Sequence, residues 1–198
     1  MFTGIIEAIG SIRAIEDRGA DRRLLIEAGK LDLAGLRPGD SIAVNGACLS
    51  VVEVSEKGFA VDVSVETLSC TTFGSLSIGA KLNLERAMRL SDRLNGHLLA
   101  GHVDGVGMVR ERRAEGRSEQ FVFEAPAGLM RFICRKGAIA VDGVSLTVNT
   151  TEADSFGVNI IPHTLTATTF GDYRPGTPVN LEVDLIARYL ESLFRPHA

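Results

Sequence analysis

Two short stretches of the chain place a thiol or hydroxyl side chain on every second residue. Cys48 and Ser50 lie in VNGACLSVV, and Ser145 and Thr147 lie in VDGVSLTVN. Because successive side chains of a β-strand point to opposite faces, the two members of each pair share one face. Such groups can attack an electrophilic carbon or hydrogen-bond to a ligand. For Cys48 we favour packing and a polar contact, because an activated thiolate needs a cationic neighbour that the sequence does not identify.

Histidine and aspartate side chains supply candidate proton carriers. His102 lies in NGHLLAGHVDG, and its imidazole could pass a proton near neutral pH. The alternative is a histidine with a structural hydrogen bond. Asp184 directly precedes an apolar helical pattern, so its carboxylate could orient a proton donor or cap the helix. The sequence leaves these alternatives open.

The two thiol and hydroxyl stretches are related by an internal repeat with an offset of 97 residues. Residues 42–51 match residues 139–148 at six of ten positions, and residues 66–85 match residues 163–182 at ten of twenty. Unrelated sequences would match at roughly one position in twenty. Each unit has the length of an ordinary domain. We therefore predict two similar domains, residues 1–97 and 98–184, followed by a terminal segment, residues 185–198.

Each unit is rich in short alternating stretches that are typical of strands. In GFAVDVSV, residues Phe59, Val61, Val63 and Val65 fall on one face. Glycine-containing turns separate several of these stretches. Six short strands per unit predict a small closed barrel, which has no exposed sheet edge. Short helical turns are expected near residues 31–35 and 129–133.

One longer helix is predicted at the end of the chain. In DLIARYLESLF the apolar side chains recur at helical spacing; they are Ile186, Tyr189, Leu190, Leu193 and Phe194. Such a stripe must be buried against another surface. Either the barrel of the same chain or a copy of this helix in an oligomer could cover it, and the sequence does not choose between them.

Composition excludes several classes of function. The net charge of −4 gives no general attraction to nucleic acid or anionic membranes. The basic run Arg110 to Arg113 is expected to be a solvated loop or strand end. No apolar run has the length of a membrane span, and the N-terminus does not read as a signal peptide. Three cysteines without CxxC spacing predict neither disulfides nor a metal site, and they favour a reducing cytoplasm.

Six motifs in order along the chain resemble riboflavin synthase of the type built from two lumazine-binding repeats. They are MFTGIIE, NGACLSV, ETL with TTFG, NGHLLAGHVDG, KGAIAVDGVSLTVN and IPHTLTATTFG. The resemblance implies an all-β fold of two tandem six-stranded Greek-key barrels with a C-terminal α-helix that holds a homotrimer. It also implies an active site between the first barrel of one subunit and the second barrel of a neighbour.

The implied reaction is a dismutation, in which two molecules of 6,7-dimethyl-8-ribityllumazine exchange a four-carbon unit. The products are riboflavin and 5-amino-6-ribitylaminouracil, and no metal or redox cofactor takes part. Two similar pockets suit a reaction between two copies of one molecule. The same fold family includes lumazine proteins, so the alternative is a carrier that binds a lumazine or flavin without converting it.

The resemblance also implies the residues of both pockets. The N-terminal pocket would consist of Gly4, Ile5, Ile6, Cys48, Leu49, Ser50, Asp62, Val63, Ser64, Val65, Glu66 and Thr67. The C-terminal pocket would consist of Gly101, His102, Val103, Ser145, Leu146, Thr147, Asn159, Ile160, Ile161, Pro162, His163 and Thr164, with Lys136 reaching a ligand in the adjoining chain. The catalytic candidates are His102, Cys48, Ser145, Thr147 and Asp184. Ala100 departs from the polar residue that is common before the second GH, and we leave it out of the site.

Overall fold

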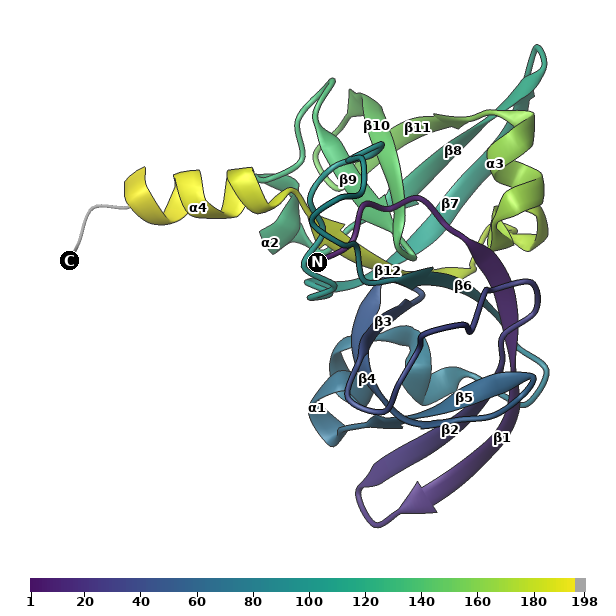
Figure 1. Cartoon of the computed structure of the whole chain (residues 1–198). Coiled ribbons are helices and arrows are strands. Elements are labelled where there is room, and N and C mark those ends of the chain that lie inside the picture. Colours follow the sequence, from purple (N-terminus) through teal and green to yellow (C-terminus); the bar gives the residue numbers. More distant parts are fainter. Residues whose placement is uncertain (195–198) are drawn as a thin grey trace.

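The computed structural model describes residues 1–194, which form two barrels and a helix that projects from the second barrel (Figure 1). The first barrel consists of β1 (Ala8–Arg18), β2 (Asp21–Glu27), β3 (Ser41–Val44), β4 (Ala47–Val54), β5 (Gly58–Val63) and β6 (Lys81–Arg86). The second barrel consists of β7 (Gly105–Glu115), β8 (Ser118–Glu124), β9 (Ala138–Val141), β10 (Val144–Thr151), β11 (Ser155–Ile160) and β12 (Pro178–Val183).

Both barrels have the same topology. The strand order around the first is β1-β2-β5-β4-β3-β6, and the second follows the equivalent order β7-β8-β11-β10-β9-β12. All pairs are antiparallel, and β2 lies beside β5 because the chain crosses over as in a Greek key. Every strand of the second barrel begins 97 residues after its counterpart in the first. The predicted all-β fold of tandem six-stranded barrels is therefore confirmed.

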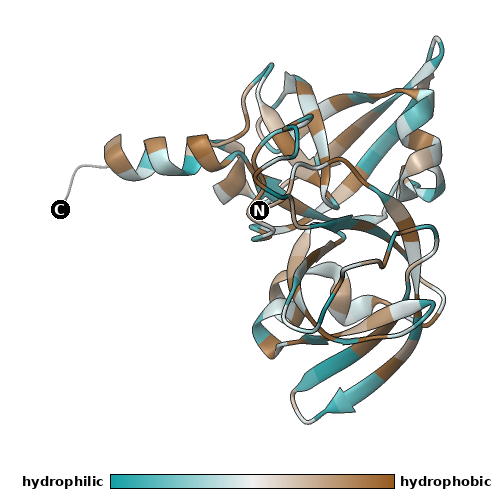
Figure 2. Cartoon of the chain, viewed as in Figure 1, coloured by the Kyte–Doolittle hydropathy of each residue, from teal (hydrophilic) through white to brown (hydrophobic). Residues whose placement is uncertain are grey.

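Alternating apolar residues fill the two barrel cores (Figure 2). Phe59, Val61 and Val63 on β5 are buried as the alternation predicts. Val65 is different, because it is 57% exposed and begins the helix α1 (Val65–Cys70). The Oγ atom of Ser64 accepts the N–H of Thr67 at 3.2 Å and caps this helix. The predicted strand through Val65 was therefore wrong beyond Val63.

The helices lie at the barrel ends and at the C-terminus. Besides α1, they are η1 (Thr72–Ser75), α2 (Ala127–Met130), α3 (Pro162–Ala167), η2 (Thr169–Asp172) and α4 (Leu185–Phe194). The predicted terminal helix is confirmed over 185–194, and its last four predicted residues lie outside the described part. The turn expected near 129–133 is α2, displaced toward the N-terminus, whereas residues 31–35 contain only a turn. In the part of the chain that the structure describes, no helix is long and apolar enough to cross a membrane.

The two barrels meet at two hairpin turns related by the repeat. Asn45 and Gly46 join β3 to β4 with φ of 43° and 79°, and Asp142 and Gly143 join β9 to β10 with φ of 43° and 78°. Asn–Gly and Asp–Gly are the preferred pairs for such left-handed turns. A Cβ atom on Gly46 would lie 2.6 Å from the backbone nitrogen of Gly143. Only glycine at both positions allows the turns to touch.

A buried polar seam surrounds this contact, and it is nearly symmetric. The Asn83 amide donates to the carbonyl of Asp142 and accepts the N–H of Thr169, at 2.9 and 2.8 Å. Its counterpart Asn180 donates to the carbonyl of Asn45 and accepts the N–H of Thr72, at the same distances. Because each asparagine binds groups of the other barrel, the seam fixes how the barrels are oriented.

Asp142 breaks the symmetry of the seam, because its counterpart is the neutral Asn45. The Asp142 carboxylate accepts the N–H of Asn180 and the hydroxyl of Tyr173. Leu76 occupies the position equivalent to Tyr173 in the first repeat. Burial raises the pKa of Asp142 to about 7, against the two hydrogen bonds that lower it. Ionised Asp142 therefore opposes folding at neutral pH.

We predict that Asp142→Asn removes part of the pH dependence of stability. The folded pKa of Asp142 lies above its unfolded value, so this residue makes the free energy of unfolding fall as pH rises from about 4 to about 7. The loss is about 4 kcal/mol at most. Urea unfolding across this pH range should give a flatter curve for the variant than for the parent protein. Parallel curves would contradict the assignment.

Candidate functional site

The leading segment of each repeat crosses to the other barrel. Phe2 and Leu99, which are 97 residues apart, exchange backbone hydrogen bonds of 2.9 and 3.1 Å. Both side chains are buried between the barrels with Ala43 and Ala140. In Figure 1 the N-terminal segment runs along the second barrel before it enters β1. The two leading segments are thus arranged as a reciprocal pair.

This crossing decides which residues share a pocket. The N–H of Ser145 donates to the carbonyl of Gly4 at 2.9 Å, and the N–H of Cys48 donates to the carbonyl of Gly101 at 2.8 Å. Both glycines have φ of 77°, and a Cβ on either would lie within 2.6 Å of the facing Cβ. Each leading segment therefore lies directly against a strand of the other barrel.

The predicted grouping of the two pockets is corrected by this arrangement. Gly4, Ile5 and Ile6 belong with the second barrel, where Ile6 packs against the core. Gly101, His102 and Val103 belong with the first barrel, where Val103 packs against the core. The repeat could not reveal that residues 4–6 and 101–103 lie on each other's barrels, because each segment could equally have packed on the equivalent surface of its own barrel.

The first candidate pocket, here called the β4 site, combines β4, the end of β5 and the start of α1 with residues 101–103. Cys48 and Ser50 share one face of β4, with Cys48 half-buried and Ser50 exposed. Asp62 binds Arg23 through two hydrogen bonds of 2.7 and 3.0 Å. This guanidinium holds the pKa of Asp62 below its usual range, so Asp62 is an anion at neutral pH.

Short polar contacts shape the helical side of the β4 site. The Oγ atoms of Ser64 and Thr67 lie 3.1 Å apart. Glu66 accepts a hydrogen bond from the thiol of Cys70 at 3.3 Å. These hydroxyl and carboxylate groups are exposed or half-buried, so they are available to the hydroxyls of a ligand.

The second candidate pocket, here called the β10 site, combines β10, the end of β11 and the start of α3 with residues 4–6. Ser145 is half-buried and Thr147 is exposed on the same face of β10. Pro162 occupies the first turn of α3, and the Ile161 cap makes no side-chain hydrogen bond. His163 and Thr164 follow where the β4 site has Glu66 and Thr67. The two sites therefore share a backbone but differ in polar side chains.

His97, which the sequence prediction left out of the site, lies beside Ser145 of the β10 site. Its Nδ1 atom lies 2.6 Å from the Oγ atom of Ser145. Burial lowers the pKa of His97, opposed in part by the charge of Asp184. The imidazole is therefore neutral at neutral pH, with Nδ1 beside the Ser145 hydroxyl and the charge of Asp184 near enough to act on the ring. The other ring nitrogen, Nε2, is buried without a hydrogen-bond partner among the described residues.

The position of Asp184 is compatible with both alternatives that the sequence left open, the helix cap and the orientation of a proton donor. Its Oδ1 atom accepts the N–H of Ile186 at 2.9 Å, so the predicted helix cap is confirmed. Its charge also acts on His97. The structure thus brings Ser145 and Asp184 together around His97, whereas Cys48 and His102 lie at the β4 site.

Lys136 lies on the loop before β9 and is exposed. Its φ is 67°, a left-handed conformation that costs a residue with a side chain roughly 1–2 kcal/mol. The counterpart Gly39 has φ of 95°. The N–H groups of both donate to equivalent strands, to Val148 and Val51, at 2.7 and 2.8 Å. A strained residue of this kind is typical of functional sites, which suggests that the lysine side chain has a function at this position.

The predicted site residues differ in exposure. Exposed and half-buried side chains are available to contact a ligand, and buried residues form the walls. Gly4, Leu49, Val63, Gly101 and Ile160 are buried and form walls. Half-buried residues are Ile6, Cys48, Thr67, Val103, Ser145, Leu146, Thr164 and Asp184. Exposed residues are Ile5, Ser50, Asp62, Ser64, Val65, Glu66, His102, Lys136, Thr147, Asn159, Ile161, Pro162 and His163.

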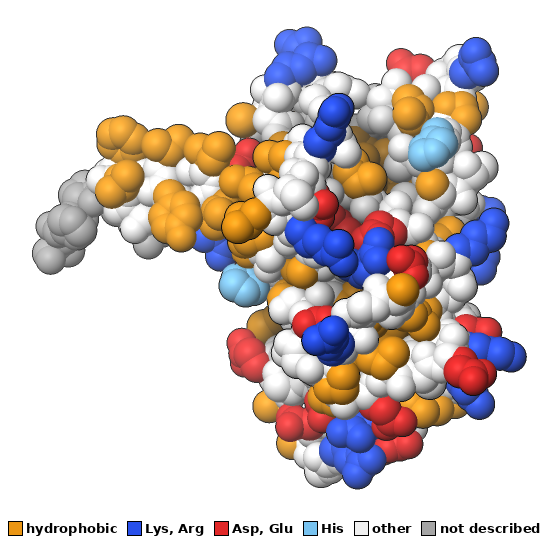
Figure 3. Space-filling view, in the orientation of Figure 1, with side chains coloured by type: hydrophobic (Ala, Val, Ile, Leu, Met, Phe, Trp, Pro, Cys, Tyr) orange, Lys and Arg blue, Asp and Glu red, His pale blue; other side chains and the backbone are white. Residues whose placement is uncertain are grey.

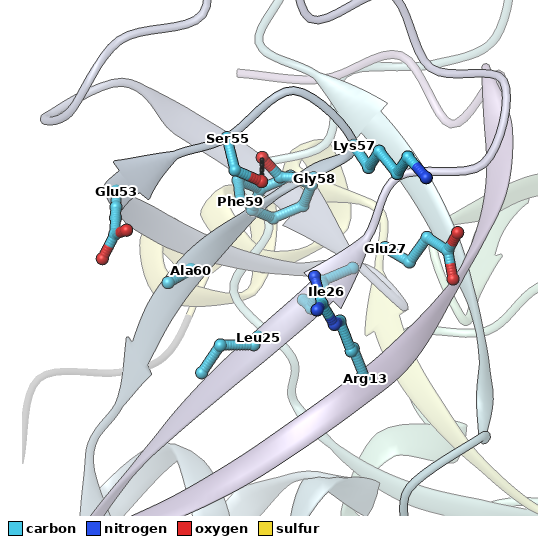
Figure 4. Close-up of a pocket in the computed structure, with 10 residues that line it drawn as sticks. All are labelled: Arg13, Leu25, Ile26, Glu27, Glu53, Ser55, Lys57, Gly58, Phe59 and Ala60. Carbon is cyan, nitrogen blue, oxygen red and sulfur yellow. Dashed lines mark hydrogen bonds between the residues drawn. The ribbon is translucent and has the colours of Figure 1, made fainter.

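Two hollows lie on the first repeat. One of about 380 Å³ is lined by residues of β1, β2, β4 and β5, and Figure 4 shows that none of the predicted site residues contributes to it. A larger groove of about 780 Å³ lies beside Thr3, Ile5 and Glu85 and reaches the loop at Arg89. Among the described residues, no group of three or more His, Cys, Asp or Glu side chains could hold a metal ion.

Known proteins resemble the chain in sequence and in fold. The lumazine binding domain family matches residues 3–87 and again residues 100–184. Riboflavin synthase of Photobacterium phosphoreum is 45% identical over 193 residues, which cover 98% of this chain and 88% of that protein. Riboflavin synthase of Brucella abortus (strain 2308) is 43% identical over 198 residues, which cover 98% of each.

Solved structures support the same relationship. The crystal structure of LumP complexed with riboflavin has a TM-score of 0.86 at 28% identity and covers 92% of this chain and 99% of LumP. The complex of LumP with 6,7-dimethyl-8-(1'-D-ribityl) lumazine has a TM-score of 0.84 at 27% identity, with the same coverage. Two matched lumazine binding domains, and 43–45% identity to riboflavin synthases along almost its whole length, show that the chain belongs to the riboflavin synthase family of enzymes.

Proposed function

We propose that this chain catalyses the dismutation of two molecules of 6,7-dimethyl-8-ribityllumazine to riboflavin and 5-amino-6-ribitylaminouracil. The observation that carries this proposal is the pair of equivalent sites at β4 and β10, which differ in their polar side chains. A reaction between two copies of one molecule needs two pockets of similar shape. Because one copy donates four carbons and the other accepts them, the two pockets need different chemistry.

Placement of the two rings supplies much of the proposed catalysis. Holding two reactants in reacting geometry can contribute roughly 7–11 kcal/mol at best. The C7 methyl group of the accepting lumazine is already acidic, because its anion delocalises into the ring. A weak base therefore suffices, and no strongly basic side chain is required.

The β10 site has the groups to carry a proton or a nucleophile. Ser145 and Thr147 offer hydroxyls, and neutral His97 lies within hydrogen-bond distance of Ser145. An imidazole in this position can accept the Ser145 proton while the oxygen, or a water molecule in its place, attacks the donor ring at C7. Asp184 stabilises the imidazolium that forms. We assign His97 to this relay together with Ser145.

The β4 site offers an exposed imidazole and anchoring groups. His102 can exchange a proton with a bound ring at neutral pH. Ser50, Ser64, Thr67 and Glu66 offer hydroxyls and a carboxylate for the ribityl chain. Cys48 is half-buried against Gly101, and among the described residues its thiol makes no hydrogen bond to a cationic side chain. This supports packing and a polar contact over nucleophilic attack.

We also propose that three copies of the chain assemble through α4 and work in the cytoplasm. Ile186, Tyr189, Leu190, Leu193 and Phe194 are 48–80% exposed on this helix. Figure 3 shows the apolar side chains following the helix onto the body of the second barrel. A stripe of this kind on an extended helix requires a partner surface. Copies of the same helix would supply it and would bring a β4 site of one subunit to a β10 site of the next.

The alternative function is a carrier that binds a lumazine or flavin without conversion. The fold similarity to LumP favours it, at 27–28% identity. The higher identity to riboflavin synthases, 43–45%, favours an enzyme. Hydroxyl and imidazole groups at both sites, and a thiol at the β4 site, also support catalysis.

Incubation of the purified protein with 6,7-dimethyl-8-ribityllumazine alone tests the function. We expect one riboflavin for every two lumazines consumed, without added metal or reductant, because one substrate molecule donates to the other. Chromatography with absorbance detection measures both compounds. Lumazine that stays bound and unchanged would identify the protein as a carrier.

A double-mutant cycle tests the pair formed by Ser145 and His97. We expect Ser145→Ala and His97→Gln each to lower kcat by about 100-fold, the contribution typical of a proton-transfer group. The double variant should be no slower than the slower single variant, because the two residues act as a unit. Multiplying losses would show that the two residues act independently.

Charge substitutions on α4 test the assembly. Leu190→Glu and Leu193→Glu should convert the trimer to monomers and abolish most turnover, because a site shared between subunits is then incomplete. Sedimentation velocity measures the mass. Ser192→Glu, on the opposite face of the same helix, is the matched control and should remain trimeric. A parent protein that sediments as a monomer would exclude the proposed assembly.

A further inference from the structure

Two buried carboxylates, Glu85 on β6 and Glu182 on β12, occupy equivalent positions of the two repeats. Each is only 4% exposed. Burial raises the pKa of Glu182 to about 7 and also raises the pKa of Glu85. No lysine, arginine or histidine pairs with either side chain among the described residues. Buried carboxylates without a cation oppose folding unless hydrogen bonds compensate for the lost water.

All of the hydrogen-bond donors to these carboxylates come from the leading segments of the two repeats, residues 3–4 and 100–102. Glu85 accepts the N–H of Thr3 at 2.6 Å, the hydroxyl of Thr3 at 2.8 Å and the N–H of Gly4 at 3.0 Å. Glu182 accepts the N–H of Ala100 at 2.8 Å and that of Gly101 at 3.1 Å, and the N–H of His102 also donates to it. A left-handed residue, here the glycine, lets successive N–H groups turn toward one anion.

Each carboxylate therefore holds a segment whose other side lies against the opposite barrel. Gly4, held by Glu85, accepts the N–H of Ser145 through its carbonyl. Gly101, held by Glu182, accepts the N–H of Cys48 in the same way, and His102 follows it. The chain of contacts runs from a buried carboxylate, through one glycine, to a strand that carries reactive groups.

We propose that Glu85 and Glu182 are positioning residues, each of which fixes the segment that its own repeat contributes to the site on the other barrel. Glu182 acts on the β4 site and its His102, and Glu85 acts on the β10 site and its Ser145. The roles in turnover rest on the proposed function. The positioning itself does not, because it concerns backbone order and ligand binding.

Glutamate suits these positions better than glutamine, because each side chain faces at least two backbone N–H donors. An ionised carboxylate presents two acceptor oxygens and no hydrogen. A glutamine of the same shape presents one acceptor oxygen and an NH₂ group, which would face backbone N–H groups. Glu182→Gln therefore leaves at least one buried N–H of residues 100–102 without an acceptor, and Glu85→Gln does the same for residues 3 and 4. Loss of a hydrogen bond to a charged group corresponds to roughly a 10- to 100-fold change in an equilibrium constant.

The Thr3 hydroxyl distinguishes the two segments and provides an independent variant. The Thr3 hydroxyl adds a side-chain donor to Glu85, whereas its counterpart Ala100 adds none to Glu182. Ala100→Ser supplies a hydroxyl at the equivalent position. It should hold residues 100–102 more tightly, and Thr3→Ala should loosen residues 3 and 4.

Amide hydrogen exchange on the full-length protein, with and without saturating riboflavin, tests the proposal. We expect Glu182→Gln to accelerate exchange about tenfold or more in residues 99–104 and to leave residues 2–6 within about twofold, with Glu85→Gln giving the reverse pattern. Riboflavin protection should weaken at residues 48–50 in Glu182→Gln and at residues 145–147 in Glu85→Gln. Ala100→Ser should slow exchange in residues 99–104. Glu56→Gln, in an exposed loop, is the control.

Uniform acceleration of both segments in both variants would overturn the proposal, because it would indicate general loss of stability. Unchanged exchange in both variants would also overturn it. Turnover is a separate measurement, in which each glutamine variant should lose about tenfold or more in kcat/KM. If the parent protein forms no riboflavin from lumazine, the proposed function fails, while the exchange and riboflavin-protection results still decide the positioning.

Discussion

The contact of two glycine turns, at Gly46 and Gly143, is the constraint on which the rest of the molecule depends. The backbones approach too closely for any side chain at these positions. Because the turns touch, Asn83 and Asn180 reach across to hydrogen-bond groups of the other barrel. The same approach brings the leading segments together at Phe2 and Leu99. A methyl group added at either glycine would push the two turns apart. The hydrogen bonds of Asn83 and Asn180 and the pairing of Phe2 with Leu99 would then be lost together.

Much of the fold could be predicted because the repeat is written in the sequence with a constant offset. Alternation identified the strands, and helical spacing identified α4. Val65 was assigned wrongly because it continues the alternation of β5, while the cap at Ser64 ends the strand two residues earlier. The exchange of the leading segments could not be predicted. A repeat shows that two surfaces are alike, but it does not show which of them a neighbouring segment will contact.

The candidate side chains at β4 and β10 were predicted from the motifs. The proposed partner of Ser145, His97, and the proposed positioning residues, Glu85 and Glu182, were not predicted. His97 lies outside the two matched segments, residues 3–87 and 100–184, so comparison of the repeats could not draw attention to it. Glu85 and Glu182 are identical in both repeats and therefore read as part of a strand pattern. Differences between the repeats, such as Cys48 and Ser145 or Ile5 and His102, mark chemistry. Identities such as the two glutamates mark the hydrogen bonds that hold equivalent backbone segments in both repeats.

The salt bridge between Arg188 and Asp104 joins α4 to the segment that carries His102. A guanidinium nitrogen of Arg188 lies 2.6 Å from the Asp104 carboxylate, which also accepts the N–H of Val183. The root of the exposed helix is thereby tied to a wall of a pocket on the opposite barrel. A tilt of α4 would therefore also displace residues 102–104, which links the position of the helix to the geometry of the β4 site within each chain.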